Sequence, residues 1–283
     1  MLCRSSIVSL AIAAAFLMAL LISPASAQVV DSGKYPDLSG QWRGSVIRYD
    51  PSKQVGRGQQ APLKEPYRLM HEASMADQAA GRQGLYLSSA KCVPMGMPWQ
   101  MYAFFAMDFV VTPATTVVLS EAMTAQPRRI FTDGRDWPEY QDPLLTGYSI
   151  GKWIDEDGDG KYDLLEVETR YMKVPRIFDQ SGIPFHEDGQ AVIKERLFLD
   201  KSDPNILHNQ MTTIDNALTR PWSAERTYRR DSTVIWTNTV CTEDNDIVVL
   251  GKDDYRVNQE GFLMPRQKGQ KPPDLRYFNE TQN

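Results

Sequence analysis

The chain of 283 residues carries 31 lysines and arginines against 36 aspartates and glutamates, which gives a net charge of −5. The basic residues are scattered and form no stripe, so the composition argues against a nucleic-acid partner. The length is enough for one domain with a full core, or for two.

The first 27 residues have the three-part order of a secretory signal peptide. Arg4 precedes an apolar stretch over residues 7–22, and Ala25 and Ala27 form a small-residue cleavage signature behind Pro24. An uncleaved membrane anchor is the alternative, but the apolar run falls short of the ~20 residues that a helix needs to cross a bilayer. We therefore expect a periplasmic or secreted mature protein with no stable membrane span.

Residues 28–266 are expected to form a single β-rich domain, followed by a polar C-terminal tail over residues 267–283. The block Asp37–Trp42 is expected to open the first strand, which runs to Tyr49. Residues 67–82 predict a helix, because apolar residues recur there at spacings of three and four. These residues are Leu69, Met70, Ala73, Ala76 and Ala80.

Beyond Pro98 the chain changes to short segments that are rich in β-branched and aromatic residues and are separated by turn residues. Strands are predicted over residues 104–111, 115–123, 129–132, 149–154, 164–172, 191–199, 210–214, 223–229, 233–241 and 247–250. Many antiparallel strands with one N-terminal helix predict an all-β fold, either a barrel or a sandwich.

Two cysteines remain after the signal peptide is removed, Cys92 and Cys241. A pair of cysteines in an oxidising compartment predicts one disulfide bond. Such a bond would tie an early segment to a late strand. Two buried free thiols are the alternative.

Residues 155–166 match the twelve-residue calcium loop position by position. Its alternating carboxylates and one backbone carbonyl offer the oxygen ligands that calcium requires, from Asp155, Asp157, Asp159, Lys161 (carbonyl), Asp163 and Glu166. Gly160 stands where the loop turns sharply. Because the flanks predict strands rather than helices, the four aspartates are stronger candidates than Glu166. A solvated acidic hairpin turn is the alternative, and a bound cation would have a structural role.

Several blocks occur in an order that resembles a large family of secreted bacterial proteins with no established reaction. They are Asp37–Trp42, Cys92–Pro98, Arg128–Pro138, Gly147–Trp153, Leu165–Thr169, Glu195–Arg196 and Thr219–Trp222. The resemblance implies a periplasmic or secreted location. Members of the family have a short turn where this chain has the calcium-like loop, so the resemblance does not imply calcium.

The Gly40-x-Trp42 opening is also similar to the first strand of lipocalin-type barrels. In those barrels the tryptophan closes the floor and packs on an arginine from a late strand. The resemblance implies a lipocalin- or calycin-like barrel, and Arg226 is the arginine expected in this role.

Strand alternation places Glu195 on the apolar face of the strand over 191–199, and Arg226 on the aromatic face that carries Trp222. An inward carboxylate needs a partner, so a Glu195–Arg226 salt bridge in the core is one interpretation. The other makes Glu195 an acid or base in a ligand cavity. His186, in a turn-rich loop, is then its acid–base partner, or else a surface histidine that caps a turn.

A dense block of arginines surrounds Asp133 and Gly134. One interpretation is a hairpin turn with the arginines paired outward. The other is a site for an anionic or sugar-like ligand, because guanidinium groups beside a tryptophan suit such molecules. The candidate ligand-binding residues are Arg128, Arg129, Arg135, Trp137, Trp222 and Arg226.

Two classes of function remain open. The first is a secreted or periplasmic barrel protein that binds a small, partly apolar molecule in a cavity lined by aromatic residues of 104–109 and 222–236 and carries a structural calcium loop. The second is a periplasmic lyase, isomerase or hydrolase in which Glu195, His186 and Asp133 perform acid–base chemistry. Convergence of His186 and Glu195 on one pocket would favour the enzyme. The sequence lacks a nucleophile elbow, a P-loop and a dinucleotide fingerprint, which favours binding.

Overall fold

Strands dominate the computed structural model, which describes residues 32–48, 61–80, 95–102, 106–120, 126–179, 182–233, 247–250, 253–257, 262–265 and 268–272. All of these except Ser32 belong to one compact unit that begins at Gly33. The predicted signal peptide and both cysteines of the predicted disulfide lie outside the described residues. The same holds for most of the predicted C-terminal tail and of the predicted strand over 233–241.

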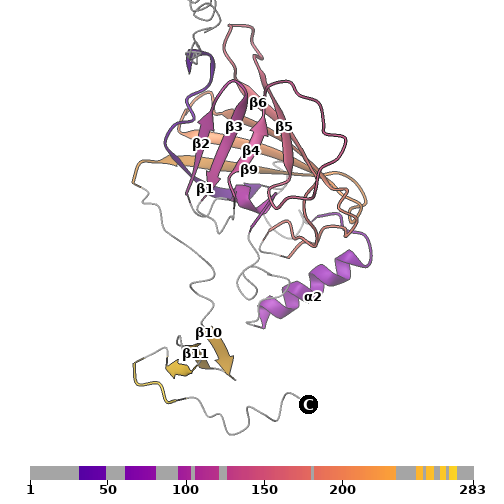
Figure 1. Cartoon of the computed structure of the whole chain (residues 1–283), viewed down its shortest axis with the longest axis vertical. Coiled ribbons are helices and arrows are strands. Elements are labelled where there is room, and N and C mark those ends of the chain that lie inside the picture. Colours follow the sequence, from indigo (N-terminus) through magenta and orange to yellow (C-terminus); the bar gives the residue numbers. More distant parts are fainter. Residues whose placement is uncertain are drawn as a thin grey trace, which may run out of the picture. The chain divides into compact units, whose positions relative to one another are not determined.

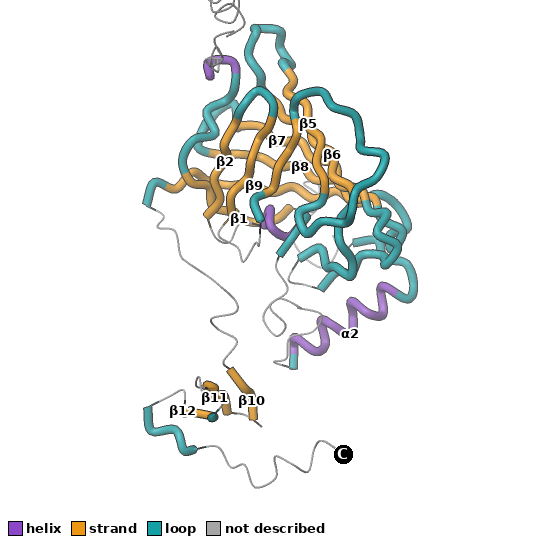
Figure 2. The backbone as a smooth tube through the Cα atoms, viewed as in Figure 1, coloured by secondary structure: helices purple, strands orange, loops and turns teal. Residues whose placement is uncertain are grey.

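Nine strands close into a barrel around a common interior (Figures 1 and 2). They are β1 (Gln41–Arg48), β2 (Ala106–Val111), β3 (Thr115–Ser120), β4 (Arg128–Phe131), β5 (Tyr148–Ile154), β6 (Leu164–Arg170), β7 (Val192–Leu199), β8 (Ile206–Ile214) and β9 (Trp222–Asp231). Strand β9 pairs with β1 and thereby closes the ring. The all-β prediction is confirmed, and the barrel replaces the sandwich.

One pair of neighbouring strands, β4 and β5, is parallel, whereas the others are antiparallel. A parallel pair needs a connection that crosses back along the sheet, and residues 132–147 provide it. Gly147 ends this connection with a φ of 65°. A Cβ atom there would lie 2.5 Å from Cγ2 of Thr169, so only glycine fits.

Alternation along the strands separates a buried inner face from an exposed outer face. The inner residues form one core, in which Trp42, Ile193, Leu207 and Tyr228 are fully buried. The predicted aromatic lining of a ligand cavity belongs to this core where it is described: Phe109 and Trp222 are buried. Phe104 and Trp236 lie outside the described residues.

A segment of the chain itself packs into this core. Residues 95–102, which end in the short 3-10 helix η3 (Trp99–Tyr102), are buried throughout wherever a side chain is described. Met97 and Met101 join the core cluster, and the hydroxyl of Tyr228 donates a hydrogen bond to the carbonyl of Met101 at 2.7 Å. The interior near Tyr228 is therefore occupied by the protein's own residues.

The tryptophan of the lipocalin-like opening packs on an arginine, but not on the arginine expected. The guanidinium carbon of Arg230 lies 4.5 Å from the ring centroid of Trp42, whose Nε1 donates to the carbonyl of Leu38. The expectation of Arg226 was wrong because of strand register. Trp42 is paired with Arg230, whereas Arg226 is paired with Ile47.

The predicted helix is present as α2 (Tyr67–Ala79), but its apolar stripe is not the buried face. Leu69 and Met70 are 53% and 41% exposed, whereas His71 and Ser74 are buried. A stripe made mostly of alanines offers little apolar area to bury. The chain just before α2 is held instead by backbone pairing, since Lys64 donates to the carbonyl of Ala217.

Three short strands form a separate antiparallel sheet: β10 (Ile247–Leu250), β11 (Asp253–Val257) and β12 (Leu263–Pro265). Strand β10 matches the predicted segment over 247–250. Among the described residues, none of the helices has the length and apolar character to cross a membrane.

Candidate binding site

A cavity of about 710 Å³ lies on the outer face of strands β5 to β9. Three consecutive residues from each of the five strands line it. They are Ile150, Gly151, Lys152, Glu166, Val167, Glu168, Lys194, Glu195, Arg196, Gln210, Met211, Thr212, Ser223, Ala224 and Glu225. We call this cavity the outer channel.

Strand register turns these residues into two rows that run across the sheet. One row is Ile150, Glu168, Lys194, Thr212 and Ser223, and the other is Lys152, Glu166, Arg196, Gln210 and Glu225. Both rows point outward. Between them lies the backbone of inward-facing residues, such as Gly151 and Ala224. The outer channel therefore has a backbone floor and two walls of side chains.

The walls carry charges that are already paired with one another. Nζ of Lys194 lies 3.5 Å from Oε2 of Glu168. Arg196 contacts Glu166 at 3.5 Å and Glu156, from the preceding loop, at 2.7 Å. Exposed pairs of this kind stabilise a fold by only ~0–1 kcal/mol, so a ligand can rearrange them at little cost. Neutral hydrogen-bonding groups complete the walls, including the Thr212 and Ser223 hydroxyls at 2.8 Å.

Directly beneath the floor, the side chain of Glu195 points into the barrel, as strand alternation predicted. Its partner is Arg128, not Arg226: Nη1 of Arg128 donates to Oε1 at 3.1 Å, and Nη2 contacts Oε2. Asn209 donates a third hydrogen bond at 2.9 Å. Glu195 and Arg128 are each 1% exposed. The predicted pairing of Glu195 with Arg226 was wrong. Strand alternation shows which face of the sheet a residue occupies, but it does not show which strand lies across the barrel.

Tyr228 lies beside this buried polar cluster and has a raised pKa. The ring of Tyr228 is fully buried, and Nδ2 of Asn209 lies 3.4 Å from its hydroxyl. Burial raises the pKa of Tyr228 to about 12, because the phenolate has lost its contact with water.

The three predicted catalytic residues have separate sets of partners. The ring of His186 lies beside Tyr67, with Nδ1 3.0 Å from Asp188, and does not line the outer channel. Asp133 is held by Arg135 at 2.6 Å, and this hydrogen bond lowers the pKa of its carboxyl. Among the described residues, no hydrogen bond or ion pair joins Glu195, His186 and Asp133 to one another.

Some of the predicted ligand-binding residues lie in the core, and others lie at the surface. Arg128, Arg226 and Trp222 are buried, whereas Arg129 and Arg135 are exposed. The guanidinium carbon of Arg135 lies 3.8 Å from the ring centroid of Phe131.

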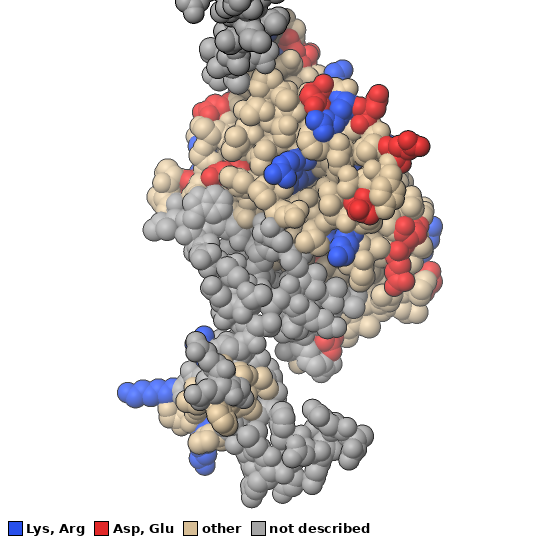
Figure 3. Space-filling view, viewed as in Figure 1, with Lys and Arg blue, Asp and Glu red and all other residues tan. Residues whose placement is uncertain are grey.

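On the same surface, Arg170 lies 4.2 Å from the ring of Trp137. Figure 3 shows basic and acidic side chains interspersed on the described barrel surface in this view.

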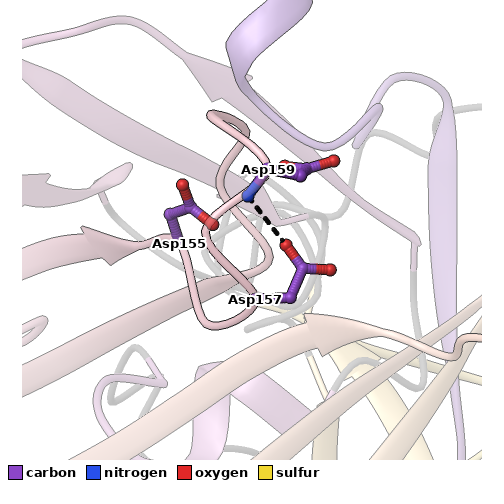
Figure 4. A group of neighbouring side chains, drawn as sticks. All are labelled: Asp155, Asp157 and Asp159. Atoms are coloured by element: carbon purple, nitrogen blue, oxygen red, sulfur yellow. Dashed lines mark hydrogen bonds between the residues drawn. The ribbon is translucent and has the colours of Figure 1, made fainter.

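The loop between β5 and β6 brings three of the predicted calcium ligands together (Figure 4). One carboxylate oxygen from each of Asp155, Asp157 and Asp159 lies within 4.8 Å of the others. The two oxygens of Asp155 accept hydrogen bonds from the backbone of Gly158 and Gly160, at 2.7 and 2.9 Å. Each oxygen keeps a further lone pair, so this hard oxygen set fits calcium.

Asp163 and Glu166 do not belong to this group of three carboxylates. Oδ2 of Asp163 accepts from the backbone of Glu156 at 2.9 Å. Glu166 lies on β6, on the wall of the outer channel, where it contacts Arg196. The backbone N–H of Lys161 donates to Asp159 at 2.8 Å. A cation here would take three carboxylates and complete its shell with carbonyls or water.

Sequence reasoning missed the outer channel, although it separated the two faces of the strand over 191–199. The signal was present in Lys194 and Arg196, which alternate with the apolar residues. Only the register of the strands shows that Glu168, Gln210 and Glu225 continue the same rows.

Comparison of the chain with protein-family models, curated proteins and solved structures gives no match. The resemblance to secreted bacterial proteins therefore stays a prediction.

Proposed function

We propose that the mature chain is a periplasmic or secreted β-barrel protein that binds a small, partly apolar molecule in the outer channel. We further propose that its β5–β6 loop holds calcium in a structural role. The observation that carries the binding proposal is the channel itself. Its volume of about 710 Å³ falls within the ~300–1,000 Å³ of typical ligand sites.

The chemistry of the walls suits a molecule with both apolar and polar parts. Ile150 stands at one end, and the aliphatic stems of Lys194 and Arg196 offer apolar contact along the length. The charged and hydroxyl groups at the rims would fix the ligand's orientation, as the few polar groups of a binding site commonly do.

The outer channel is a better candidate than the barrel interior. Residues 95–102 pack into the core, and Tyr228 is hydrogen-bonded to one of their carbonyls. A ligand inside the barrel would have to displace this segment, whereas a ligand in the outer channel displaces only water.

The calcium proposal rests on the three convergent carboxylates and on what the loop supports. Glu156 belongs to this loop and holds Arg196, which forms part of the channel wall. A cation that removes the repulsion among Asp155, Asp157 and Asp159 would stabilise the loop and hence the position of Glu156. This role is structural, because the ligands form one closed loop.

The binding proposal is tested by filling the channel. Ser223→Trp places an indole in the channel at its β9 end. Arg229→Trp places one on the same strand outside the channel, at an exposed position. The mature protein and both variants are purified natively from the periplasm, and bound small molecules are identified by mass spectrometry.

We expect a stoichiometric small molecule with the unmodified protein and with Arg229→Trp, and its loss from Ser223→Trp. Equal amounts of the molecule in both variants would place binding elsewhere. The absence of any bound molecule from all three proteins would contradict the binding proposal.

A further inference from the structure

A group of aromatic side chains borders the β5 end of the outer channel. We call Phe131, Trp137, Tyr148 and Tyr171 the aromatic platform. The rings of Phe131 and Tyr148 lie 5.1 Å apart, and the ring of Trp137 lies 6.0 Å from Tyr148 and 6.3 Å from Tyr171. All four side chains are partly exposed, so the rings are neither core residues nor free in solvent.

The platform and the channel form one continuous surface. Tyr148 precedes Ile150 by two residues on β5, so both point outward and stand side by side. Tyr148 is paired with Arg170, and Ile150 is paired with Glu168. Arg170 donates to Glu168 at 2.6 Å, and Glu168 also contacts Lys194 in the channel wall.

The backbone at one platform residue is held in an unfavourable conformation. Tyr171 has a φ of 56°, the only positive value among the described residues other than glycines. A bulky residue in this left-handed region costs ~1–2 kcal/mol. Such outliers occur where the position of a side chain matters for binding.

The number of strands that the outer channel crosses indicates the shape of a ligand that would fit it. The channel crosses five strands, which spans about 19 Å from β5 to β9 when neighbouring strands lie about 4.8 Å apart. A compact molecule would occupy only part of this length. The surface therefore fits an elongated, unbranched molecule that lies across the strands.

The charged side chains in the channel walls indicate which class of ligand would fit. The channel walls hold three cationic residues, Lys152, Lys194 and Arg196, and three anionic ones, Glu166, Glu168 and Glu225. This balance favours neither an anion nor a cation. Alternating donors and acceptors suit a chain of hydroxyl groups, because each hydroxyl both donates and accepts. A peptide fits less well, since the closed barrel leaves no free strand edge for it to pair with.

We infer that the outer channel and the aromatic platform together bind a linear, uncharged oligosaccharide. The apolar face of one sugar ring packs on the platform, and the following rings lie along the channel with their hydroxyls bonded to its walls. This inference rests on the proposed function and names the class of ligand for that same site.

Titration calorimetry of the mature protein tests it with three uncharged hexasaccharides: cellohexaose, maltohexaose and fully acetylated chitohexaose. A charged hexasaccharide, hexagalacturonate, is measured beside them. We expect at least one uncharged probe to bind. Trp137→Ala should weaken that binding about tenfold, as the loss of one aromatic stacking contact does.

Tyr140→Ala is the matched control. Tyr140 belongs to the same connection as Trp137, is 78% exposed and makes no ring contact among the described residues. It should leave the affinity unchanged. A loss of affinity in Ser223→Trp, at the opposite end of the channel, would show that the ligand spans the full length.

The outcomes separate the two proposals. If no uncharged probe binds, or if only hexagalacturonate binds, the oligosaccharide inference is overturned. The binding proposal still stands in that case if a natively bound molecule is lost from Ser223→Trp. Equal affinity of Trp137→Ala and the unmodified protein would also overturn the inference, because the platform would then have no part in binding.

Discussion

At the scale of single residues, the buried pair of Arg128 and Glu195 determines whether Glu195 is a reactive group or a structural one. Both carboxylate oxygens are engaged by the same guanidinium, and Asn209 adds a further donor. These hydrogen bonds hold the carboxylate inside the barrel among buried side chains, away from the outward-facing walls of the channel. We interpret Glu195 as a core residue that organises the barrel beneath the outer channel.

This interpretation predicts an asymmetry between single and double substitutions. Arg128→Met leaves the Glu195 charge buried without a partner and should lower the free energy of unfolding by ~3–5 kcal/mol. The double variant Arg128→Met/Glu195→Met removes both charges and should recover much of this loss. Urea denaturation of the three proteins measures both effects. A double variant that is less stable than Arg128→Met would contradict the pairing.

The raised pKa of Tyr228 predicts how the free energy of unfolding depends on pH in the alkaline range. Its pKa is raised to about 12 in the folded protein, against ~10 for an exposed tyrosine. Between these two values the unfolded chain loses the proton while the folded chain keeps it, so this group's contribution to stability is present below pH ~10 and is lost as the pH rises towards ~12.

We expect the free energy of unfolding to fall between pH 9 and 11.5, and to fall less steeply in Tyr228→Phe. Denaturant titrations at fixed pH values measure both slopes. Equal slopes in the two proteins would show that Tyr228 does not contribute to the decline.

At the scale of elements, the β5–β6 hairpin joins the candidate metal site to the outer channel. The loop at its tip carries Asp155, Asp157 and Asp159, and its strands carry Ile150, Lys152 and Glu168 into the channel. The tip of the loop carries no core residue, because its side chains from 156 to 161 are exposed, whereas Tyr162 at the end of the loop packs against the core. Loss of a cation should therefore loosen the hairpin without unfolding the barrel.

Removal of calcium with a chelator tests whether the ion stabilises the β5–β6 hairpin. A chelator should lower the melting temperature, and excess calcium should restore it by mass action. Magnesium should restore it less well, because it requires a smaller and stricter octahedron. Asp155→Asn/Asp159→Asn should weaken the response to calcium, whereas Glu139→Gln, an exposed substitution outside the loop, should preserve it. A melting temperature that responds neither to chelator nor to calcium would identify the loop as an acidic turn.

At the scale of the whole molecule, closure of the barrel creates both the core and the outer channel. Pairing of β9 with β1 brings the guanidinium of Arg230 over the ring of Trp42, which belongs to the core. The same closed ring keeps β5 to β9 in continuous register, so that side chains from five strands form two unbroken rows. A sandwich with a break among these strands would interrupt the rows.

Local features of the fold could be predicted from the sequence alone. Alternation with Ile193 and Leu197 places Glu195 inside the barrel, and the spacing of carboxylates around Gly160 predicts the turn that gathers Asp155, Asp157 and Asp159. The helix over 67–82 and the succession of strands follow from spacing in the same way. Each depends on residues that are close together in the chain, so the period of the pattern is sufficient evidence.

Contacts between distant strands could not be predicted in this way. Arg128 rather than Arg226 meets Glu195, and Arg230 rather than Arg226 meets Trp42. The outer channel exists because Glu168, Lys194 and Gln210 belong to neighbouring rows in one register. Alternation assigns a face to each residue, but a shift of register by two residues keeps every face and changes every partner. Packing across the closed barrel, which no local pattern records, selects the register.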